Sequence, residues 1–302
     1  MTVRVVRAEA PAKVNLRLRV LAREASGYHS LESLFCAVSL ADAVEVRAGE
    51  PGIRLEVTGG VETGPPENNL VARAAECFHA ALGSAPALDV RLEKRIPSAA
   101  GLGGGSSDAA ATLRALNALH GEPFGRAELL RMAAELGSDV PFFLCGSTLA
   151  LGWGRGERLL ALPALPPRPV LVAHPGVAMP TGDAFRRIAE RRGGAWEPEA
   201  FAFGLELLGG WPGVSALAEN DFEAPALERI PVLAAAREAM QGPGALVCLL
   251  AGSGASMFAV YPSTDERDEA EREVRALGLA TWTARTLAEE PPLRVDPPGA
   301  SG

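Results

Sequence analysis

The clearest pattern near the start of the chain is an alternation of apolar and polar residues, which has the period of a β-strand. The apolar positions are Val14, Leu16, Leu18 and Val20, and the positions between them hold Lys13, Asn15, Arg17 and Arg19. Because every second side chain of a strand lies on the same face, Lys13 and Asn15 share one polar face. Such a face either lines a site or is an ordinary solvated surface, and these residues alone favour the solvated surface.

Helical spacing of apolar residues predicts three helices in the first half of the chain. One begins at Asn69 and ends at Gly83, a second covers residues 109–120, and a third covers residues 126–136 and ends at Gly137. Alternation at residues 43–46 and 53–57 predicts a hairpin, and residues 88–92 form a strand that leads into a glycine-rich segment. This half of the chain therefore mixes helices with strands.

The second half of the chain begins after four prolines within residues 163–169, which mark a boundary. Strands are expected at residues 170–173, 256–261 and 280–284, and helices at 181–192, 234–240 and 265–277. This order is typical of a small α+β domain with helices packed on one side of a sheet. We expect two domains, residues 1–162 and 163–288, followed by a disordered tail at 289–302 that is rich in proline and glycine.

The glycine-rich segment between the strand at 88–92 and the next helix predicts a phosphate-binding loop. Glycine lets backbone N–H groups surround an anion, and the N-terminus of a helix faces the same anion. The expected binding residues are Pro97, Ser98, Ala99, Ala100, Gly101, Leu102, Gly103, Gly104, Gly105, Ser106 and Ser107. We expect Ser106, Ser107 and Asp108 to start the helix, because these residue types cap helices well. The alternative is a flexible turn.

Two better-known nucleotide loops do not fit this segment. The Walker pattern requires a lysine after the last glycine, and the loop has none. The dinucleotide pattern requires a sixth-position glycine where this chain has Ser106. The cation that accompanies the phosphates must therefore come from another part of the chain.

Composition narrows the function further. The 302 residues carry a net charge of −8, which argues against a nucleic-acid or anionic membrane surface as a partner. Four widely spaced cysteines and the absence of a secretory pattern in the first residues favour a cytoplasmic protein. Among 29 basic residues only Lys13 and Lys94 are lysines, so each of them draws attention as a functional candidate.

Two further segments carry candidate chemistry. Tyr28 and His29 lie on a turn after Gly27, where they could stack on a nucleobase or merely cap a core, and the residues leave both open. Asp139 lies between the end of a helix and an apolar run, where a carboxylate can be held at the edge of a core. For Asp139 the local sequence favours a simple turn-capping role.

Taken together, these segments resemble the GHMP kinase superfamily, which is named for galactokinase, homoserine kinase, mevalonate kinase and phosphomevalonate kinase. The resemblance rests on AKVNLRL, GYHSLESLF, PSAAGLGGGSSDAA, GSDVPFF, LVAHPGVAMPT, NDFE and GSGASMFAVY. It implies an α+β, two-domain GHMP kinase fold, in which an N-terminal ribosomal-protein-S5-domain-2-like α/β domain precedes a C-terminal ferredoxin-like α+β domain. The chain is most similar to the branch whose acceptor is a cytidine diphosphate derivative of a branched erythritol.

The resemblance also assigns roles to residues. Lys13 and Asp139 match the catalytic pair, and the glycine-rich loop matches the site of ATP, with Mg²⁺ carried by the nucleotide and no protein ligand of the metal assigned. The positions that match the cytidine diphosphate site are Asn15, Tyr28, His29 and Phe185. The implied reaction belongs to the non-mevalonate isoprenoid pathway, and the implied protein is a monomer or homodimer. One departure is Ser26, where an acidic residue often precedes the Gly-Tyr-His triplet.

Two other functions are compatible with parts of the pattern. A different GHMP kinase would use mevalonate, homoserine or a sugar as acceptor, but these small acceptors carry no base to stack against Tyr28 and Phe185. A nucleotide-binding module without turnover would need the glycine-rich loop alone, and the presence of both Lys13 and Asp139 argues against it.

Overall fold

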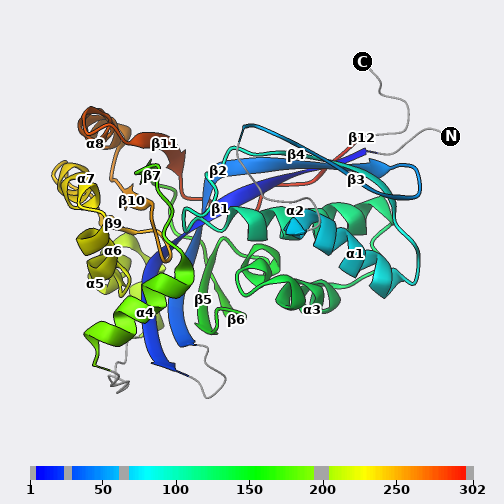
Figure 1. Cartoon of the computed structure of the whole chain (residues 1–302), viewed down its shortest axis with the longest axis horizontal. Coiled ribbons are helices and arrows are strands. Elements are labelled where there is room, and N and C mark those ends of the chain that lie inside the picture. The colour runs from blue at the N-terminus through cyan, green and yellow to red at the C-terminus, as the bar shows by residue number, and fades with distance from the viewer. Residues whose placement is uncertain (1–4, 24–28, 61–67, 194–203, 297–302) are drawn as a thin grey trace.

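A computed structural model of the 302-residue chain describes residues 5–23, 29–60, 68–193 and 204–296. Two β-sheets organise these residues, a larger one with eight strands and a smaller one with four (Figure 1). This mixture of helices and sheets agrees with the α+β fold expected from the sequence.

The larger sheet is built mainly from the first half of the chain. Its central order is β12-β1-β2-β4-β3, with β5 joined to β2, β6 to β5 and β8 to β1. Its strands are β1 (Val5–Arg23), β2 (His29–Ala48), β3 (Gly52–Thr58), β4 (Ala87–Glu93), β5 (Leu149–Gly154), β6 (Arg158–Leu162), β8 (Glu219–Asn220) and β12 (Arg294–Asp296). Figure 1 shows helices α1 (Leu70–Leu82), α2 (Gly104–Leu119) and α3 (Arg126–Leu136) together on one face of it.

The predicted hairpin of residues 43–46 and 53–57 is wrong. The strands that contain these residues are β2 and β3, and β4 lies between them, antiparallel to β2 and parallel to β3. The connection β3–α1–β4 crosses over through a helix, which is how two neighbouring parallel strands are usually joined. Alternation identified both strands but carried no information about which strand pairs with which.

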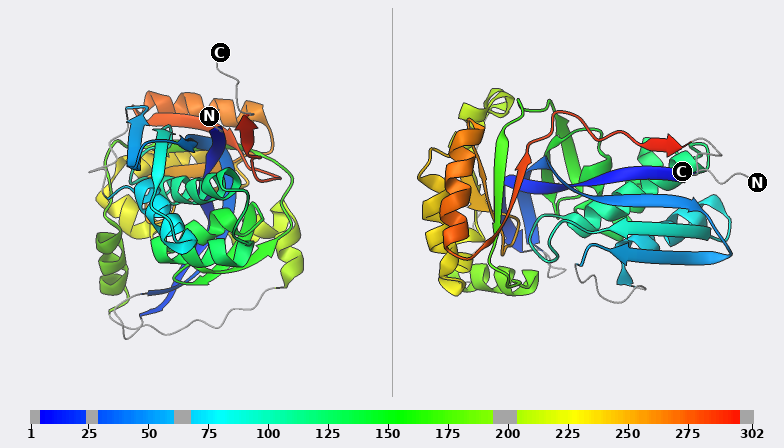
Figure 2. Two further views of the ribbon diagram at one scale, coloured as in Figure 1. Left: turned by 90° about the vertical axis from the view of Figure 1, so that its right-hand side faces the viewer. Right: turned by 90° about the horizontal axis from the view of Figure 1, so that it is seen from above.

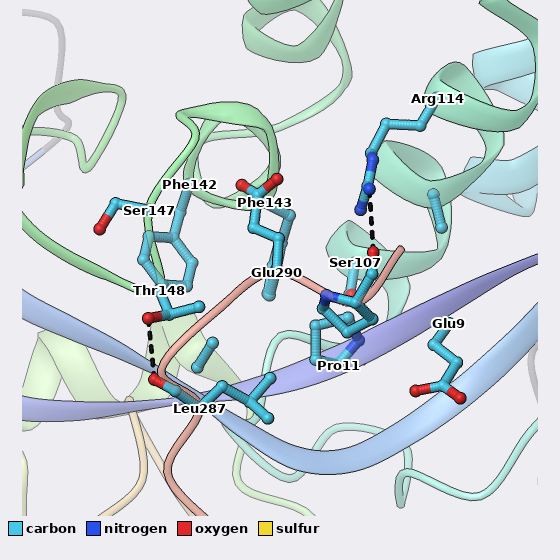
Figure 3. Close-up of a pocket in the computed structure, with 13 residues that line it drawn as sticks. Glu9, Pro11, Ser107, Arg114, Phe142, Phe143, Ser147, Thr148, Leu287 and Glu290 are labelled. Carbon is cyan, nitrogen blue, oxygen red and sulfur yellow. Dashed lines mark hydrogen bonds between the residues drawn. The ribbon is translucent and has the colours of Figure 1, made fainter. Parts of the chain in front are cut away.

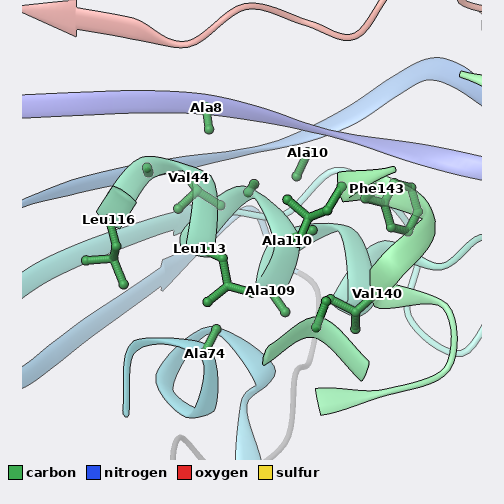
Figure 4. Packing of buried hydrophobic residues seen from close by; sticks show 14 of the residues in the cluster. Ala8, Ala10, Val44, Ala74, Ala109, Ala110, Leu113, Leu116, Val140 and Phe143 are labelled. Carbon is green, nitrogen blue, oxygen red and sulfur yellow. The ribbon is translucent and has the colours of Figure 1, made fainter. Parts of the chain in front are cut away.

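Helix α2 packs closely against β1 because both surfaces carry small residues. Ala8 and Ala10 of β1 face α2 across the core (Figure 4). Ala110 of α2 lies in the same buried cluster. Leu113 of α2 is fully buried in the same cluster, which also includes Ala74 of α1. This close packing fixes the N-terminal end of α2, and with it the glycine-rich loop, relative to β1.

Between residues 10 and 18, strand β1 is buried on both faces, so the expected solvated face around Lys13 is not observed. Its polar residues Lys13, Asn15 and Arg17 are only 4%, 2% and 3% exposed. Its apolar positions pass through three successive clusters of buried side chains, represented by Ala8, Val14 and Leu18. Burial of charged side chains is costly unless they are paired, so this polar face is a candidate site.

The smaller sheet is antiparallel and has the order β11-β7-β10-β9. Its strands are β7 (Pro169–His174), β9 (Val247–Leu250), β10 (Met257–Val260) and β11 (Ala280–Arg285). Val170 and Val172 of β7 pack toward β1, whereas Leu171 and Ala173 pack toward helices. These helices are α4 (Thr181–Arg191), α6 (Glu223–Arg229), α7 (Val232–Gln241) and α8 (Thr264–Ala276).

The strand order of the smaller sheet confirms the ferredoxin-like arrangement expected for the C-terminal part. Seen from above, α8 lies along the outer edge of the molecule, and the smaller sheet lies between it and the larger sheet (Figure 2). One short helix, α5 (Trp211–Leu217), departs from the expected one-sided arrangement, since its buried residues join the cluster of β1 on the inner face.

The predicted disordered tail differs from the structure over residues 289–296. Strand β12 pairs antiparallel with β1, with Val5 opposite Asp296. Upstream of it, the Gly146 N–H donates to Glu290 at 3.1 Å, and Arg114 donates to the Pro291 carbonyl at 3.0 Å. The composition of this segment suggested disorder, but backbone pairing with an edge strand requires no particular side chains. The rest of the predicted disordered tail, residues 297–302, lies outside the described part of the chain.

The domain limits at residues 162 and 288 stay a prediction. The larger sheet does not follow these limits strictly, since it also takes β8 and β12 from the second half of the chain. In the part of the chain that the structure describes, no helix is both long and apolar enough to cross a membrane.

Candidate active site

The glycine-rich loop connects the end of β4 to the start of α2. Gly101 and Gly103 have φ values of 78° and 71°, a conformation that residues with a side chain rarely adopt. Helix α2 begins at Gly104, and no described side chain caps its N-terminus. The expectation that residues 106–108 start the helix is therefore wrong by two positions. The uncapped first turn leaves backbone N–H groups available to an anion.

A cavity of about 370 Å³ opens over this loop. The predicted nucleotide-binding residues from Pro97 to Ser106 all line it, together with Asn68, Asn69, Leu70, Lys94 and Asp108. Ser107 is the exception, because its side chain lies on the other side of α2. The cavity combines an open helix N-terminus with a glycine backbone, which are the features that bind phosphate groups.

Ser107 instead lines a small, partly open cavity behind the loop (Figure 3). This cavity measures about 20 Å³, which is close to the space that one water molecule needs. Leu287 and Pro291 also line this cavity, and the Ser107 hydroxyl has no hydrogen-bond partner among the described residues. The cavity is far too small for a nucleotide.

Lys94 forms a buried ion cluster at the end of β4 that the sequence signalled only through the rarity of lysine. Its ammonium lies 2.7 Å from Asp108 of α2 and is also paired with Asp42 of β2. Asp42 in turn accepts hydrogen bonds from the backbone N–H groups of Arg95 and Ile96 at 2.5 and 2.8 Å. The cluster ties together the two ends of the glycine-rich loop.

Burial and charge compete in this cluster. Burial alone would lower the pKa of Lys94, but the two carboxylates outweigh it and raise the pKa, so Lys94 stays protonated. Burial raises the pKa of Asp108 to about 7, in spite of Lys94, and the negative charge of Asp42 adds to this rise. One ammonium between two buried carboxylates thus leaves Asp108 able to take up a proton near neutral pH.

The structure brings the two predicted catalytic residues into contact. Lys13 Nζ of β1 lies 3.3 Å from Asp139 Oδ2 and donates a hydrogen bond to Asn15 Oδ1 at 2.9 Å. Asp139 immediately precedes the 3₁₀ helix η2 (Val140–Leu144), but its side chain makes no capping hydrogen bond there. The turn-capping role that the local sequence favoured is therefore not observed.

Hydrogen bonds fix the strand that carries Lys13 to the glycine-rich loop and to β2. The backbone N–H of Lys13 donates to the carbonyl of Leu102 at 2.9 Å, which joins β1 directly to the glycine-rich loop. Asn15 Nδ2 donates to Ser33 Oγ at 2.7 Å, and that hydroxyl donates to the Arg17 carbonyl at 3.0 Å. Rigid support of this kind is what a catalytic pair requires.

Two further cavities continue from the loop past this pair. The first, of about 320 Å³, shares Gly101 and Gly103 with the cavity over the loop and is lined by Lys13, Asn15 and Asp139. The second, of about 690 Å³, shares Asp139 and Phe185 with the first. A continuous series of cavities therefore runs from the glycine-rich loop, across the Lys13–Asp139 pair, to α4.

The far cavity contains the predicted aromatic residues that the structure describes. The rings of His29 and Phe185 are stacked, with centroids 4.5 Å apart and planes inclined by 11°. Phe185 also makes an edge contact with Phe222, with centroids 4.9 Å apart. Tyr28, the third predicted aromatic, lies outside the described residues. Arg155 and Arg186 line the same cavity, and no sequence signal distinguished them from the other 25 arginines.

Among the described residues, no group of three or more His, Cys, Asp or Glu side chains is arranged to hold a metal ion. The loop offers backbone N–H groups at the open N-terminus of α2, which are groups that bind anions. A Cβ added at Gly103 would lie 3.0 Å from Lys13 Cγ. The glycine at residue 103 therefore lets the loop backbone lie close to the Lys13 side chain.

Comparisons with known proteins agree with this geometry. The GHMP kinases N terminal domain matches residues 69–147, and the GHMP kinases C terminal domain matches residues 205–279. A 4-diphosphocytidyl-2-C-methyl-D-erythritol kinase of Anaeromyxobacter dehalogenans strain 2CP-C is 43% identical over 299 residues, covering 95% of this chain and 92% of that protein. The kinase of the same name from Deinococcus radiodurans is 40% identical over 273 residues, covering 90% and 87%.

Solved structures show the same likeness. The crystal structure of a 4-(cytidine 5'-diphospho)-2C-methyl-D-erythritol kinase superposes with a TM-score of 0.77 at 36% identity, covering 93% of this chain and 98% of that one. A homoserine kinase from Cytophaga hutchinsonii superposes with a TM-score of 0.72 at 22% identity, covering 97% of each chain, and shows the shared fold alone.

Proposed function

This chain belongs to the 4-diphosphocytidyl-2-C-methyl-D-erythritol kinase family of GHMP kinases, and we propose that it transfers the γ-phosphoryl group of ATP to the 2-hydroxyl of that compound. The products are ADP and the 2-phosphate, as a step of the non-mevalonate isoprenoid pathway. The observation that carries the proposal is the contact of Lys13 with Asp139 where the nucleotide cavity meets the cavity beside α4.

Asp139 is the proposed general base. A hydroxyl is a poor nucleophile at neutral pH, so a carboxylate must accept its proton as it attacks the phosphorus. The Asp139 side chain is 33% exposed and lines both cavities, which makes it accessible to an acceptor hydroxyl. The proton passes from the 2-hydroxyl to the carboxylate, and the oxygen takes up the phosphoryl group while ADP leaves.

Lys13 is the proposed electrostatic partner of this step. Its side chain is 5% exposed and held by Asn15 and Asp139, so its ammonium is fixed before the substrates bind. A fixed cation beside the attacking oxygen stabilises the negative charge that develops there. Lys13 also supplies the cation that the glycine-rich loop lacks.

The proposed site for the phosphates of ATP is the glycine-rich loop, residues Pro97 to Ser106. The positive φ angles of Gly101 and Gly103 and the uncapped N-terminus of α2 support this role. Ser107 was assigned to the same site, but its side chain lines the small cavity behind α2, so a direct contact of its hydroxyl with the nucleotide is not part of the proposal. The Mg²⁺ that accompanies ATP supplies further neutralisation of phosphate charge when bound.

The cavity beside α4 is the proposed site of the cytidine diphosphate part. Phe185 and His29 offer ring faces to the cytosine, and the family resemblance assigns Tyr28 to the same role. Arg155 and Arg186 bring positive charge to the cavity, which suits the diphosphate. Asn15, which lines the cavity at Lys13, contacts the acceptor close to the reacting hydroxyl in this arrangement.

The four cysteines of the chain form no disulfide, which supports the cytoplasmic location expected for an enzyme that uses ATP. Burial raises the pKa of Cys36 to about 12, so this thiol stays protonated. A monomer or a homodimer is proposed, since every residue assigned to the reaction comes from one chain.

The test is release of ADP from MgATP by the purified protein, with 4-diphosphocytidyl-2-C-methyl-D-erythritol, mevalonate, homoserine and galactose as separate acceptors. We expect turnover with the first compound alone. Turnover with another acceptor would replace the proposed substrate, and no turnover with any of the four would favour a nucleotide-binding module.

A further inference from the structure

Two glycine segments from different halves of the chain touch in the site. A Cβ added at Gly101 would lie 1.9 Å from the carbonyl oxygen of Ala251, and one added at Gly252 would lie 2.9 Å from the carbonyl oxygen of Gly101. The backbone of the nucleotide loop therefore rests directly on the turn of residues 251–254, with no side chain between them. We call this turn, which joins β9 to β10, the supporting turn.

The side chain of Asn220 contacts the backbone of the supporting turn and of the strand that precedes it. Asn220 Nδ2 donates hydrogen bonds to the carbonyls of Leu250 and Gly252, both at 2.8 Å. Asn220 Oδ1 accepts a hydrogen bond from the Phe222 N–H at 2.9 Å. The residue is 8% exposed, so both donors and the acceptor of its amide are used in a buried setting.

Asn220 is in turn fixed to the strand that carries Lys13. It lies in β8, which pairs parallel to β1 with Asn220 opposite Leu18. The next residue, Asp221, donates its N–H to the Leu18 carbonyl at 3.0 Å, and its Oδ2 accepts from the Val20 N–H at 2.6 Å. Both groups of contacts are made by residues of the NDFE segment, to which the proposed reaction gives no role.

We propose that Asn220 is a positioning residue for phosphoryl transfer, because it sets the supporting turn, and through it the nucleotide loop, at a fixed distance from β1 and Lys13. The inference rests on the proposed function for its kinetic consequences. Only an amide fits this position: an aspartate keeps the acceptor for Phe222 but loses both donors and presents a carboxylate to two carbonyl oxygens.

The test compares Asn220→Asp with Asn117→Asp. Asn117 is a matched control, because its buried amide also brackets a backbone segment: Nδ2 donates to the Phe124 carbonyl at 3.0 Å and Oδ1 accepts from the Phe124 N–H at 3.1 Å. It lies near the far end of α2, roughly 20 Å from the loop at about 1.5 Å per residue. Both substitutions remove buried donors, but only one of them removes support from the nucleotide loop.

We expect Asn220→Asp to lower kcat by about tenfold or more and to raise the KM for MgATP, because small misplacements of reacting groups are costly. The KM for the cytidylyl substrate should change much less, since the contact with Phe222 is kept. Calorimetry with a non-hydrolysable ATP analogue should show a matching loss of affinity. Asn117→Asp should lower the thermal midpoint and leave the kinetic constants and the affinity for the analogue as in the wild type.

Wild-type kinetics and analogue affinity in Asn220→Asp would overturn the inference, and so would an equal kinetic loss in both variants. If Asn220→Asp does not fold, Asn220→Ser, which keeps one donor, is judged by the same two comparisons. A wild-type protein that binds the ATP analogue but does not phosphorylate the cytidylyl compound would refute the proposed function, while the analogue affinities would still decide the role of Asn220.

Discussion

Lys13 Nζ and Asp139 Oδ2 are 3.3 Å apart, although the first residue belongs to β1 and the second follows α3. Local sequence favoured a solvated strand face around Lys13 and a turn cap at Asp139, and both interpretations are wrong because each residue is the other's partner. Burial of an ammonium requires a compensating charge, and the carboxylate that compensates Lys13 is also the proposed general base.

Replacement of Asp139 by alanine is expected to lower kcat by at least about a hundredfold, the low end for loss of a general base. The affinity for the ATP analogue should be nearly unchanged, because Asp139 does not line the nucleotide cavity. Asp139→Asn is the companion variant, since it keeps the size of the side chain and removes only its basicity. Steady-state kinetics that show a loss of less than tenfold in either variant would mean that another group accepts the proton.

Much of the site was predictable because its signals are local. The backbone of a glycine-rich loop needs glycine at Gly101 and Gly103 wherever the loop lies in the fold, and these positions have the expected left-handed φ angles. The helices at Leu70–Leu82 and Arg126–Leu136 were equally visible, since apolar period and end signals agree within each segment.

The relationships that sequence could not supply are long-range. Rarity alone drew attention to Lys94, and nothing near it in the sequence indicated Asp42 as its partner. The position of β4 between β2 and β3, and the pairing of β12 with β1, depend on how the chain returns to the sheet. Backbone pairing of that kind leaves no mark in the side-chain pattern of a short edge strand.

Replacement of Phe185 by alanine is expected to raise the KM for the cytidylyl substrate more than the KM for MgATP. Stacking of a base on an aromatic ring contributes about 1–3 kcal/mol. Because His29 already stacks on Phe185, the base must displace that contact, and the expected rise is at the low end, about fivefold. Phe185→Tyr keeps a ring and should restore the KM. An equal rise for both substrates in Phe185→Ala would argue against stacking.

Replacement of Gly103 by alanine is expected to lower kcat by about tenfold or more, because misplacement of a catalytic group by a fraction of an ångström is costly. The added methyl would lie 3.0 Å from Lys13 Cγ and 3.1 Å from Lys13 Cε, at a backbone φ of 71°. Gly121→Ala is the control, since Gly121 also has a positive φ, of 79°, but has open space around it. Backbone strain should lower the thermal midpoint of both variants, whereas displacement of Lys13 should lower kcat in Gly103→Ala alone. Equal kinetic constants in the two variants would contradict the prediction.

Replacement of Asp108 by asparagine is expected to change how stability depends on pH. Burial raises the pKa of Asp108 in the folded protein to about 7, above the usual value of 3.8 that applies in the unfolded chain. Between these values the folded state binds more protons than the unfolded state, so this group stabilises the fold at low pH and loses that contribution as pH rises through about 7.

The stability of the wild type relative to Asp108→Asn should therefore be greater at pH 5 than at pH 8. Urea denaturation of both proteins at the two pH values measures this difference directly, since the variant carries every other titrating group of the wild type. A difference that grows from pH 5 to pH 8 would mean that Lys94 holds Asp108 ionised throughout, and that the cluster behaves as a simple ion pair.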